Sequence, residues 1–237
     1  MKKYTAFIFA RGGSKGLPDK NILEIGGVPL IAWSIKHAKS CSSIERVIVS
    51  TDSEKIKEIA LEYGADVPFM RPAELATDTA SELDAWRHAI KELERIEGRY
   101  PEIIISLPAT SPLRISSDID RALERYSEGD VDVVIGVTDA HRNPYFNMVK
   151  FDSQNHVEIL NNPNGDIKRR QDAPRVFDIT TVVYIANSEF VAKCSSLFTG
   201  RVGAVHIPQE RSIDIDNLHD FKIAQYLMMS AMNVKNN

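Results

Sequence analysis

The chain contains little cysteine, with only Cys41 and Cys194 among its 237 residues. Two thiols cannot build the disulfide framework of a small secreted protein, and by themselves they cannot supply the four ligands of a structural zinc site. Glycine and proline are also modest, at 12 and 11 residues, which excludes a collagenous or low-complexity chain. We therefore expect a globular protein of a reducing compartment, the cytoplasm.

Long apolar runs and an excess of positive charge are missing as well. No stretch reaches the roughly 18 consecutive apolar residues of a transmembrane helix, and the apolar run after Lys3 stops at Arg11, short of a signal-peptide core. The chain has 29 basic and 33 acidic residues, a formal net charge of −4, which argues against nucleic acid as the main partner. We expect a soluble protein that binds neither a membrane nor a nucleic acid.

Short apolar runs alternate with helical periodicity along most of the chain. Strands are expected at 4–10, 46–50, 102–107, 131–137, 180–186 and 203–207. Helices are expected at 29–39, 54–63, 81–97, 116–128, from 188 and at 217–232, with Ser53 and Ser117 as N-caps. This alternation indicates βαβ units and hence an α/β protein, a three-layer fold with a mainly parallel, Rossmann-like sheet.

The strand and helix rhythm falters after about residue 138. Asn143-Pro144 and the polar cluster at 161–166 mark turns between shorter extended pieces. No linker and no internal repeat divides the chain. We therefore interpret residues 1–237 as one domain that carries an inserted hairpin or flap at about 140–178.

A glycine-rich loop follows the first expected strand. It reads Ala-Arg-Gly-Gly-Ser-Lys-Gly-Leu-Pro-Asp-Lys-Asn over residues 10–21. Ligands of an open parallel sheet bind beyond the carboxyl ends of the strands, and glycines let backbone amides approach a phosphate chain closely. Leu17-Pro18 stands where the Walker motif needs Lys-Ser/Thr, and the dinucleotide fingerprint is absent too. The loop suits a triphosphate; the alternative is an ordinary turn with solvated charges.

Two carboxylates alternate near the C-terminal end, in Ser-Ile-Asp-Ile-Asp at 212–216. Residues at i and i+2 of an extended segment share a face, so Asp214 and Asp216 would lie side by side. Hard oxygen ligands suit Mg²⁺ bound to substrate phosphates. The residues alone also allow a second interpretation, in which both acids stabilise the N-terminus of the helix that starts near Asn217.

Five motifs, in order along nearly the whole chain, resemble those of the acylneuraminate cytidylyltransferases, the CMP-sialic acid synthetases. They are the 10–21 loop, Ser50-Thr51-Asp52, residues 71–81, Thr110-Ser111-Pro112-Leu113-Arg114 and residues 212–216. Enzymes of this family join CMP to a nine-carbon 2-keto sugar acid. The resemblance implies nucleotidyl transfer from CTP, in which the sugar's anomeric hydroxyl attacks the α-phosphorus and pyrophosphate leaves, for the synthesis of a bacterial-type surface glycan such as lipopolysaccharide or capsule.

The resemblance also implies roles for individual residues. Asp214 and Asp216 would bind Mg²⁺, with Mn²⁺ as the alternative. The catalytic set would be Arg11, Lys15, Lys20 and Asp216. The nucleotide would be bound by Ala10, Arg11, Gly12, Gly13, Ser14, Lys15, Lys20, Asn21, Arg71, Thr79, Ala80 and Ser81.

The acceptor side of the resemblance carries departures. Arg170 aligns with the arginine that meets the sugar carboxylate, a group that a guanidinium fork matches, and Tyr184 and Phe198 would line the acyl pocket unless they are core residues. Pro108-Ala109, Phe146 and residues 178–181 differ from the sialate pattern. N-acetylneuraminate, legionaminate, pseudaminate and 3-deoxy-manno-octulosonate therefore all stay open as acceptors, as does a non-catalytic nucleotide-binding module. The flap resembles the family's dimerisation element, which implies a homodimer.

Overall fold

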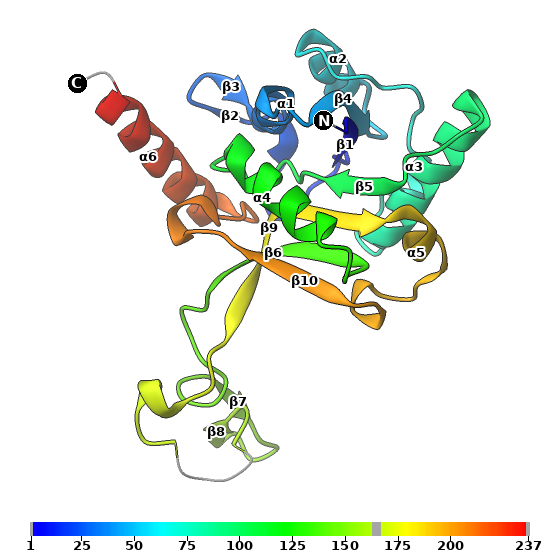
Figure 1. Cartoon of the computed structure of the whole chain (residues 1–237). Coiled ribbons are helices and arrows are strands. Elements are labelled where there is room, and N and C mark those ends of the chain that lie inside the picture. Colours follow the sequence, from blue (N-terminus) through cyan, green and yellow to red (C-terminus); the bar gives the residue numbers. More distant parts are fainter. Residues whose placement is uncertain (1, 163–166, 236–237) are drawn as a thin grey trace.

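The computed structural model describes residues 2–162 and 167–235, with side chains described through residue 231. Its centre is a six-stranded sheet in the order β10-β6-β9-β5-β1-β4 (Figure 1). The strands are β1 (Tyr4–Phe9), β4 (Ile44–Ser50), β5 (Ile103–Ser106), β6 (Val133–Asp139), β9 (Phe177–Asn187) and β10 (Val202–His206). All run parallel to one another except β9, which is antiparallel to both of its neighbours. The expected α/β class and the mainly parallel sheet are confirmed.

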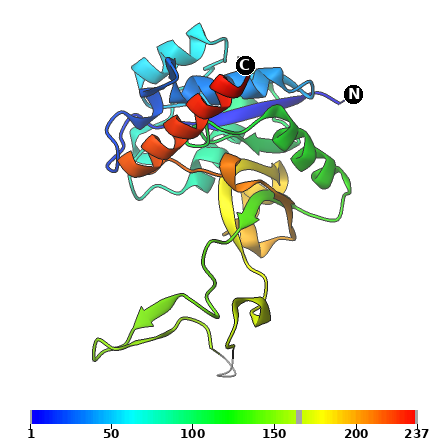
Figure 2. The ribbon, with the colours of Figure 1, turned by 90° about the vertical axis from the view of Figure 1, so that its left-hand side faces the viewer.

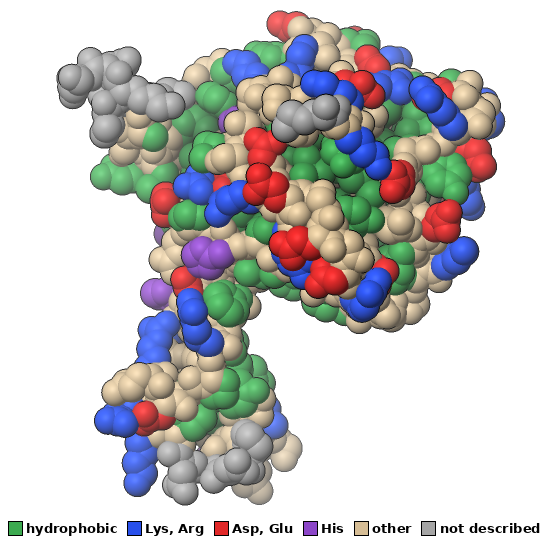
Figure 3. All heavy atoms as spheres, in the orientation of Figure 1, with side chains coloured by type: hydrophobic (Ala, Val, Ile, Leu, Met, Phe, Trp, Pro, Cys, Tyr) green, Lys and Arg blue, Asp and Glu red, His purple; other side chains and the backbone are tan. Residues whose placement is uncertain are grey.

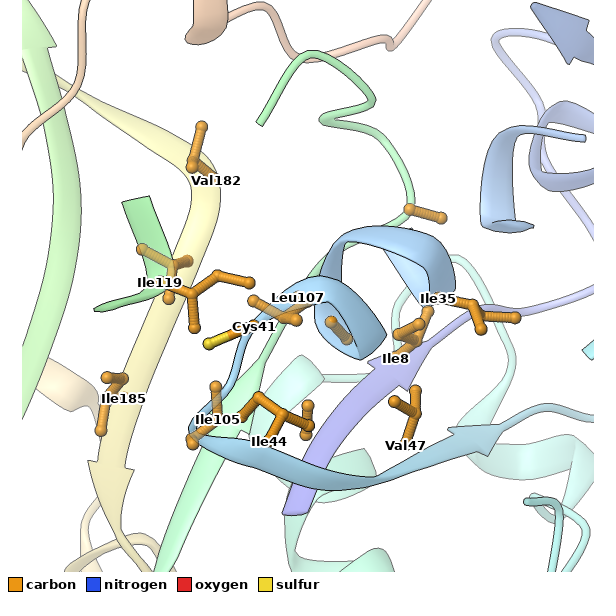
Figure 4. Packing of buried hydrophobic residues seen from close by; sticks show 14 of the residues in the cluster. Ile8, Ile35, Cys41, Ile44, Val47, Ile105, Leu107, Ile119, Val182 and Ile185 are labelled. Carbon is orange, nitrogen blue, oxygen red and sulfur yellow. The ribbon is translucent and has the colours of Figure 1, made fainter. Parts of the chain in front are cut away.

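Helices cover both faces of this sheet (Figure 1). On one face lie α1 (Leu30–Ser40), α2 (Glu54–Glu62) and α4 (Ser116–Ser127), and on the other α3 (Glu82–Glu97) and α5 (Ser188–Lys193). Figure 4 shows Ile35 of α1 beside Ile8 of the sheet, and Ile105 near Ile44 in the same core. Strands that are covered on both faces must be apolar throughout, which explains the unbroken apolar runs in the sequence.

The sheet departs from the sequence expectation at β9. The strand is longer than residues 180–186 and runs against its neighbours, and its pairing with β6 jumps from Ile135–Tyr184 to Gly136–Thr180. Residues 181–183 therefore bulge out of the ladder. Gly136 allows this, because a Cβ there would lie 2.6 Å from the Thr180 hydroxyl.

The two expected N-caps have opposite outcomes. Ser53 caps α2, since its hydroxyl accepts from the Ile56 amide. Ser117 does not cap α4, because that helix already begins at Ser116 and it is the Asp118 carboxylate that accepts from the Ile115 amide, at 3.1 Å. The N-cap position is Ile115, two residues before the predicted Ser117.

A projecting element of residues 140–176 leaves the body between β6 and β9 (Figures 1 and 2). It carries a two-stranded sheet of β7 (Val149–Phe151) and β8 (Val157–Ile159). At its base the side-chain amide of Asn143 donates to the Pro174 carbonyl at 2.9 Å. This bond joins the segment that leaves the body to the segment that returns to it. Part of the turn cluster expected at 161–166 lies outside the described residues, since 163–166 are not described.

The last helix, α6 (Leu218–Lys235), packs near the short hairpin of β2 (Glu24–Ile25) and β3 (Val28–Pro29). Ala224 and Met228 of the helix form a small core with Ile25, Leu30 and Ile215. This packing fixes residues 212–216 against the body of the protein. Within the described ranges, no helix combines the length and the apolarity that a membrane crossing needs.

Candidate active site

A cavity of about 260 Å³ lies beyond the carboxyl ends of β1, β4 and β5. This is the edge where an open α/β sheet binds its ligands. Six of the residues expected to bind the nucleotide line it: Arg11, Lys20, Asn21, Arg71, Ala80 and Ser81. Segments far apart in the sequence thus meet at one hollow.

The glycine-rich loop is fastened to the sheet edge by specific bonds. The Gly12 amide donates to Asp52 at 2.8 Å, and the buried Asn21 side chain donates to the Arg11 carbonyl at 2.9 Å. Gly16 touches the segment of the acidic pair, since a Cβ there would lie 2.4 Å from the Asp216 carbonyl oxygen. Glycine at this position therefore brings the loop and the two aspartates together.

Arg71 is buried at the back of the cavity. It donates to the Ser50 carbonyl from Nη2 at 2.6 Å and to the Ser50 hydroxyl from Nε at 3.2 Å. Burial lowers the pKa of Arg71 to about 10, and the charges of Asp52 and Glu82 partly oppose that shift. Two residues of the Ser50-Thr51-Asp52 motif thus have structural roles. Ser50 orients Arg71, and Asp52 binds the glycine-rich loop at Gly12.

Asp78 pairs with two of the three cations of the loop. Its carboxylate lies 2.7 Å from Arg11 and 2.6 Å from Lys15, and these two partners lower the pKa of Asp78. Two cations therefore already converge on a single anionic group. A triphosphate that used Arg11 and Lys15 would have to displace this carboxylate.

We expect Asp78→Asn to bind CTP about threefold more tightly, because exposed ion pairs that compete with the nucleotide are weak but not negligible. Calorimetry with CTP measures the effect. Asp84→Asn is the matched control, since Asp84 pairs with Arg87 on α3 and does not line the cavity. Weaker CTP binding by Asp78→Asn alone would mean that Asp78 orients the cations instead of competing for them.

Asp214 and Asp216 lie close enough for their charges to interact, and Lys20, which lines the cavity, lies 3.2 Å from Asp216. Between them Ile215 is buried, and its amide donates to the Thr110 carbonyl at 3.0 Å. Burial raises the pKa of Asp214, and the nearby charge of Asp216 adds to the shift, while Thr110, Thr181 and Lys20 oppose it. One oxygen of Asp214 is buried and lacks a hydrogen-bond partner among the described residues. A cation between the two carboxylates would satisfy that oxygen.

The hydrogen-bonded cap of α6 does not use these two carboxylates. The Asn217 side chain accepts from the His219 amide at 2.8 Å and the Asp220 amide at 3.2 Å, while Asp220 accepts from the Asn217 amide at 3.1 Å. This reciprocal pair caps the helix. Asp216 instead pairs with Lys20, whose Nζ lies 3.2 Å from its carboxylate.

The chemistry of this donor set fits a hard divalent cation. Within the described part of the chain, no group of three or more His, Cys, Asp or Glu residues is arranged to hold a metal. Mg²⁺ typically takes one or two carboxylates from the protein and completes its shell with phosphates and water. Two aspartates beside the glycine-rich loop match that preference.

The remaining predicted residues are distributed unevenly. Ala10 is buried at the end of β1, and Gly12, Gly13 and Ser14 follow it in the loop. The Thr79 hydroxyl contacts that of Thr77 at 3.4 Å. Thr79 is exposed and does not line the cavity, unlike its neighbours Ala80 and Ser81.

The three residues expected to bind the sugar do not lie together. Tyr184 lies opposite Ser106 at the end of β5, with its ring edge against Trp86, and burial raises its pKa to about 12. Arg170 lies at the base of the projecting element and donates to the Ala140 and His141 carbonyls. Phe198 is 62% exposed, in a turn that packs beside the start of β6, at the opposite edge of the sheet. The structure does not bring Phe198 to the cavity of the same chain.

Sequence reasoning assigned no role to Arg114, although it quoted its motif. Arg114 is fully buried and donates to the Val182 carbonyl at 2.6 Å, the Ser34 hydroxyl at 2.7 Å and the Pro108 carbonyl at 2.7 Å. It thus satisfies backbone groups that the β9 bulge leaves outside the ladder. Arg114 therefore links Pro108, which lines the cavity, to the bulge of β9.

The family model described as "Cytidylyltransferase" matches residues 5–221. The chain belongs to the cytidylyltransferase family. It is 36% identical to the CMP-N,N'-diacetyllegionaminic acid synthase of Campylobacter jejuni, across 96% of both chains. It is 35% identical to the flagellin modification protein B of Campylobacter coli, also across 96% of both. It is 35% identical to an N-acylneuraminate cytidylyltransferase of Streptococcus agalactiae, of which it spans about half, 52%.

Solved structures agree on the fold of this cytidylyltransferase. A CMP:2-keto-3-deoxy-manno-octonic acid synthetase complexed with CTP superposes with a TM-score of 0.71 at 16% identity, over 98% of this chain and all of that one. A 4-diphosphocytidyl-2C-methyl-D-erythritol synthase from Anaerococcus prevotii superposes with a TM-score of 0.65 at 14% identity, over 96% and 99%. The chain is a nucleotidyltransferase by family, with the α/β architecture of these enzymes.

Proposed function

We propose that the protein transfers CMP from CTP to the anomeric hydroxyl of a nonulosonate sugar acid and releases pyrophosphate, in the cytoplasm, for a surface glycan. The observation that carries this proposal is the Asp214–Asp216 pair. Both carboxylates are free of helix capping and lie against a loop that holds Arg11, Lys15 and Lys20. A module that only bound a nucleotide would not need such a pair.

The residues of the cavity account for the reaction by position and charge. Asp214 and Asp216 would hold Mg²⁺ or Mn²⁺, which neutralises phosphate charge when bound. The loop amides with Arg11, Lys15 and Lys20 would hold the triphosphate in line for attack. Nucleotidyl transfer needs little beyond such alignment and electrostatic stabilisation, so no protein nucleophile is required.

Two acceptors stand first among the candidates, N,N'-diacetyllegionaminate and N-acetylneuraminate. The relative named as a diacetyllegionaminic acid synthase matches this chain over 96% of both lengths, and this supports the former. The relative named as an N-acylneuraminate cytidylyltransferase matches at nearly the same identity and supports the latter. The departures at Pro108-Ala109 and residues 178–181 from the sialate pattern keep both acids as candidates.

Mass spectrometry of products identifies the acceptor. Purified protein is incubated with CTP, Mg²⁺ and one acid at a time: diacetyllegionaminate, N-acetylneuraminate, pseudaminate and 3-deoxy-manno-octulosonate. We expect a CMP-sugar from a nine-carbon acid. A product from the eight-carbon acid alone would overturn the nonulosonate assignment but keep the cytidylyltransferase, and no product from any acid would favour a binding module.

We expect Arg170→Ala to raise the KM for the sugar acid by about 10-fold or more, with little change in the KM for CTP. A guanidinium that binds a carboxylate contributes roughly 1.5–3 kcal/mol. Arg169→Ala is the matched control, because its side chain is already paired with Asp172. Initial rates at varied sugar concentration measure both variants. An unchanged sugar KM in Arg170→Ala would remove this residue from the carboxylate site.

The projecting element supports the proposal of a homodimer. Opposed pairs place Val149, Ile159, Phe151 and Val157 on one face of the β7–β8 sheet, and Lys150 and Glu158 on the other. Phe151 is 68% exposed, and the space-filling view shows hydrophobic side chains on this element (Figure 3). An isolated hairpin of two short strands is only marginally stable. An exposed apolar face of this kind is typical of a protein–protein interface. A second copy of the chain would supply it.

We expect sedimentation velocity to find a dimer for the wild type and a monomer for Phe151→Asp, since a carboxylate in an apolar interface is costly. Glu158→Gln, on the charged face of the same hairpin, should remain a dimer. The proposal fails if the wild type is a monomer with full activity.

A further inference from the structure

Thr181 lies in the bulge of β9, and the reaction described above gives it no role. The ladder between β9 and β6 omits residues 181–183. Arg114 fixes the backbone at this point, since its Nη2 donates to the Thr181 carbonyl at 3.3 Å. A bulge turns a side chain away from the direction that a regular strand would give it. The direction of the Thr181 hydroxyl is therefore set by the bulge.

Three hydroxyls meet at this bulge. The Ser111 hydroxyl lies 2.7 Å from that of Thr181, and the Thr110 hydroxyl donates to the Thr181 hydroxyl at 3.4 Å. Ser111 is fully buried, whereas Thr110 lines the cavity. The cluster thus extends from the protein interior to the wall of the candidate active site.

The Asp214 carboxylate adjoins this cluster. The hydroxyls of Thr110 and Thr181 both bond to it, and these bonds oppose the rise of its pKa on burial. The backbone holds the two segments together, because the Ile215 amide donates to the Thr110 carbonyl at 3.0 Å. Oδ1 of Asp214 is buried and has no hydrogen-bond partner within the described ranges. The hydroxyls therefore fix this carboxylate and leave one of its oxygens over.

The supply of protons gives these hydrogen bonds a direction. A hydroxyl has one proton and two lone pairs, while an ionised carboxylate only accepts. Thr181 can therefore bond to Asp214 only by donating its proton, and the 2.7 Å bond must then be donated by Ser111. A charged acceptor strengthens such a bond. The hydrogen bonds thus run from Ser111 through Thr181 to Asp214.

We propose that Thr181 is a positioning residue of the metal site, and that its hydroxyl holds the Asp214 carboxylate with Oδ1 available to the divalent cation. The inference rests on the proposed metal role of Asp214 and deepens it. Removing a group that bonds to a metal ligand typically lowers metal affinity by about 10- to 100-fold. The bulge of β9 thereby has a function, which is to direct a hydroxyl to a metal ligand.

Calorimetry with CTP tests this role without turnover, because no sugar acid is present. The Kd of CTP is measured in EDTA and again in Mg²⁺ buffer, and the ratio of the first value to the second reports what the cation contributes. We expect Thr181→Val, which keeps the branched shape of threonine, to lower this ratio by about 10-fold and to leave the Kd in EDTA unchanged. Thr181→Ser restores the hydroxyl and should recover most of the wild-type ratio.

Two variants separate positioning from stability. Thr180→Val is the matched control, because the hydroxyl of this neighbouring threonine is buried without a hydrogen-bond partner in the described part of the chain, and its ratio should stay at the wild-type value. Ser111→Ala removes the same 2.7 Å bond as Thr181→Val, yet it leaves Thr181 a proton for Asp214. Both variants should lose similar thermal stability, but only Thr181→Val should lose most of the ratio. Equal falls of the ratio in these two variants would overturn the proposal.

The failure of this inference can be told from the failure of the proposed function. Asp214→Asn is expected to bring the ratio near one, and a wild-type ratio in Thr181→Val beside that result would overturn the role of Thr181 and keep the metal site. A wild-type ratio in Asp214→Asn would contradict the metal assignment and with it both proposals. Pyrophosphate release with none of the sugar acids would contradict the proposed transfer, while the ratios would still show whether Thr181 positions Asp214.

Discussion

Replacing Asp216 by alanine is expected to lower the rate of pyrophosphate release by about 100-fold or more and to weaken CTP binding in Mg²⁺, while the protein stays folded. The loss follows from removing one of two carboxylates that would hold the metal against the phosphates. The fold should tolerate the change, because this side chain is 73% exposed and its only ion pair within the described ranges is the one with Lys20. Initial rates and a thermal melt measure the two effects.

Glu210→Ala is the control for Asp216→Ala. Glu210 is an exposed acid of the same segment whose only ion pair within the described chain is with Arg211, at 3.6 Å. It should keep wild-type rates. Near-normal turnover by Asp216→Ala would remove Asp216 from the metal site and leave the acidic pair without an assigned function.

Replacing Arg114 by methionine is expected to cost about 3–5 kcal/mol of unfolding free energy, because it breaks a fully buried charged network. Methionine fills much of the volume, but the carbonyls of Val182, Pro108 and Thr181 lose their donor. Two of these belong to the β9 bulge, where no neighbouring strand can replace the bond. Urea unfolding monitored by circular dichroism measures the loss.

Arg121→Met is the control for Arg114→Met. Arg121 is an exposed residue of α4, and its partner Asp118 keeps its bonds to Arg211 and to the Ile115 amide. We expect a loss below about 1 kcal/mol. Equal losses of unfolding free energy in the two arginine variants would show that the bonds of Arg114 to Pro108 and Val182 are not specially stabilising.

The sequence predicted the parallel strands well because their burial on both faces leaves an unbroken apolar run. Residues 4–10 and 46–50 were expected as strands, and β1 and β4 occupy almost the same residues. It could not predict the direction of β9, since antiparallel and parallel strands in a buried sheet show the same apolar pattern. The bulge could not be predicted for a similar reason, because threonine, the residue type at positions 180 and 181, is also common in regular strands.

The candidate site was predicted in part. Its cations and its acidic pair carry a distinctive spacing, whereas Asp78 and Glu82 look like the solvated acids that often flank a helix start. Tertiary contact alone reveals that Asp78 binds Arg11 and Lys15 and that Glu82 lines the same cavity as Arg71. The cap of α6 did leave a signal, since Asn217 and Asp220 have the spacing of a capping box.

Pyrophosphate release from the purified protein, with each of the four ribonucleoside triphosphates in turn and a nine-carbon 2-keto sugar acid in Mg²⁺ buffer, tests the central claim most directly. The structure predicts release that requires both CTP and the acid, with ATP, GTP and UTP far slower. No pyrophosphate release with any acid while CTP still binds, or equal release with all four nucleotides, would contradict a CTP-dependent transferase that uses this cavity.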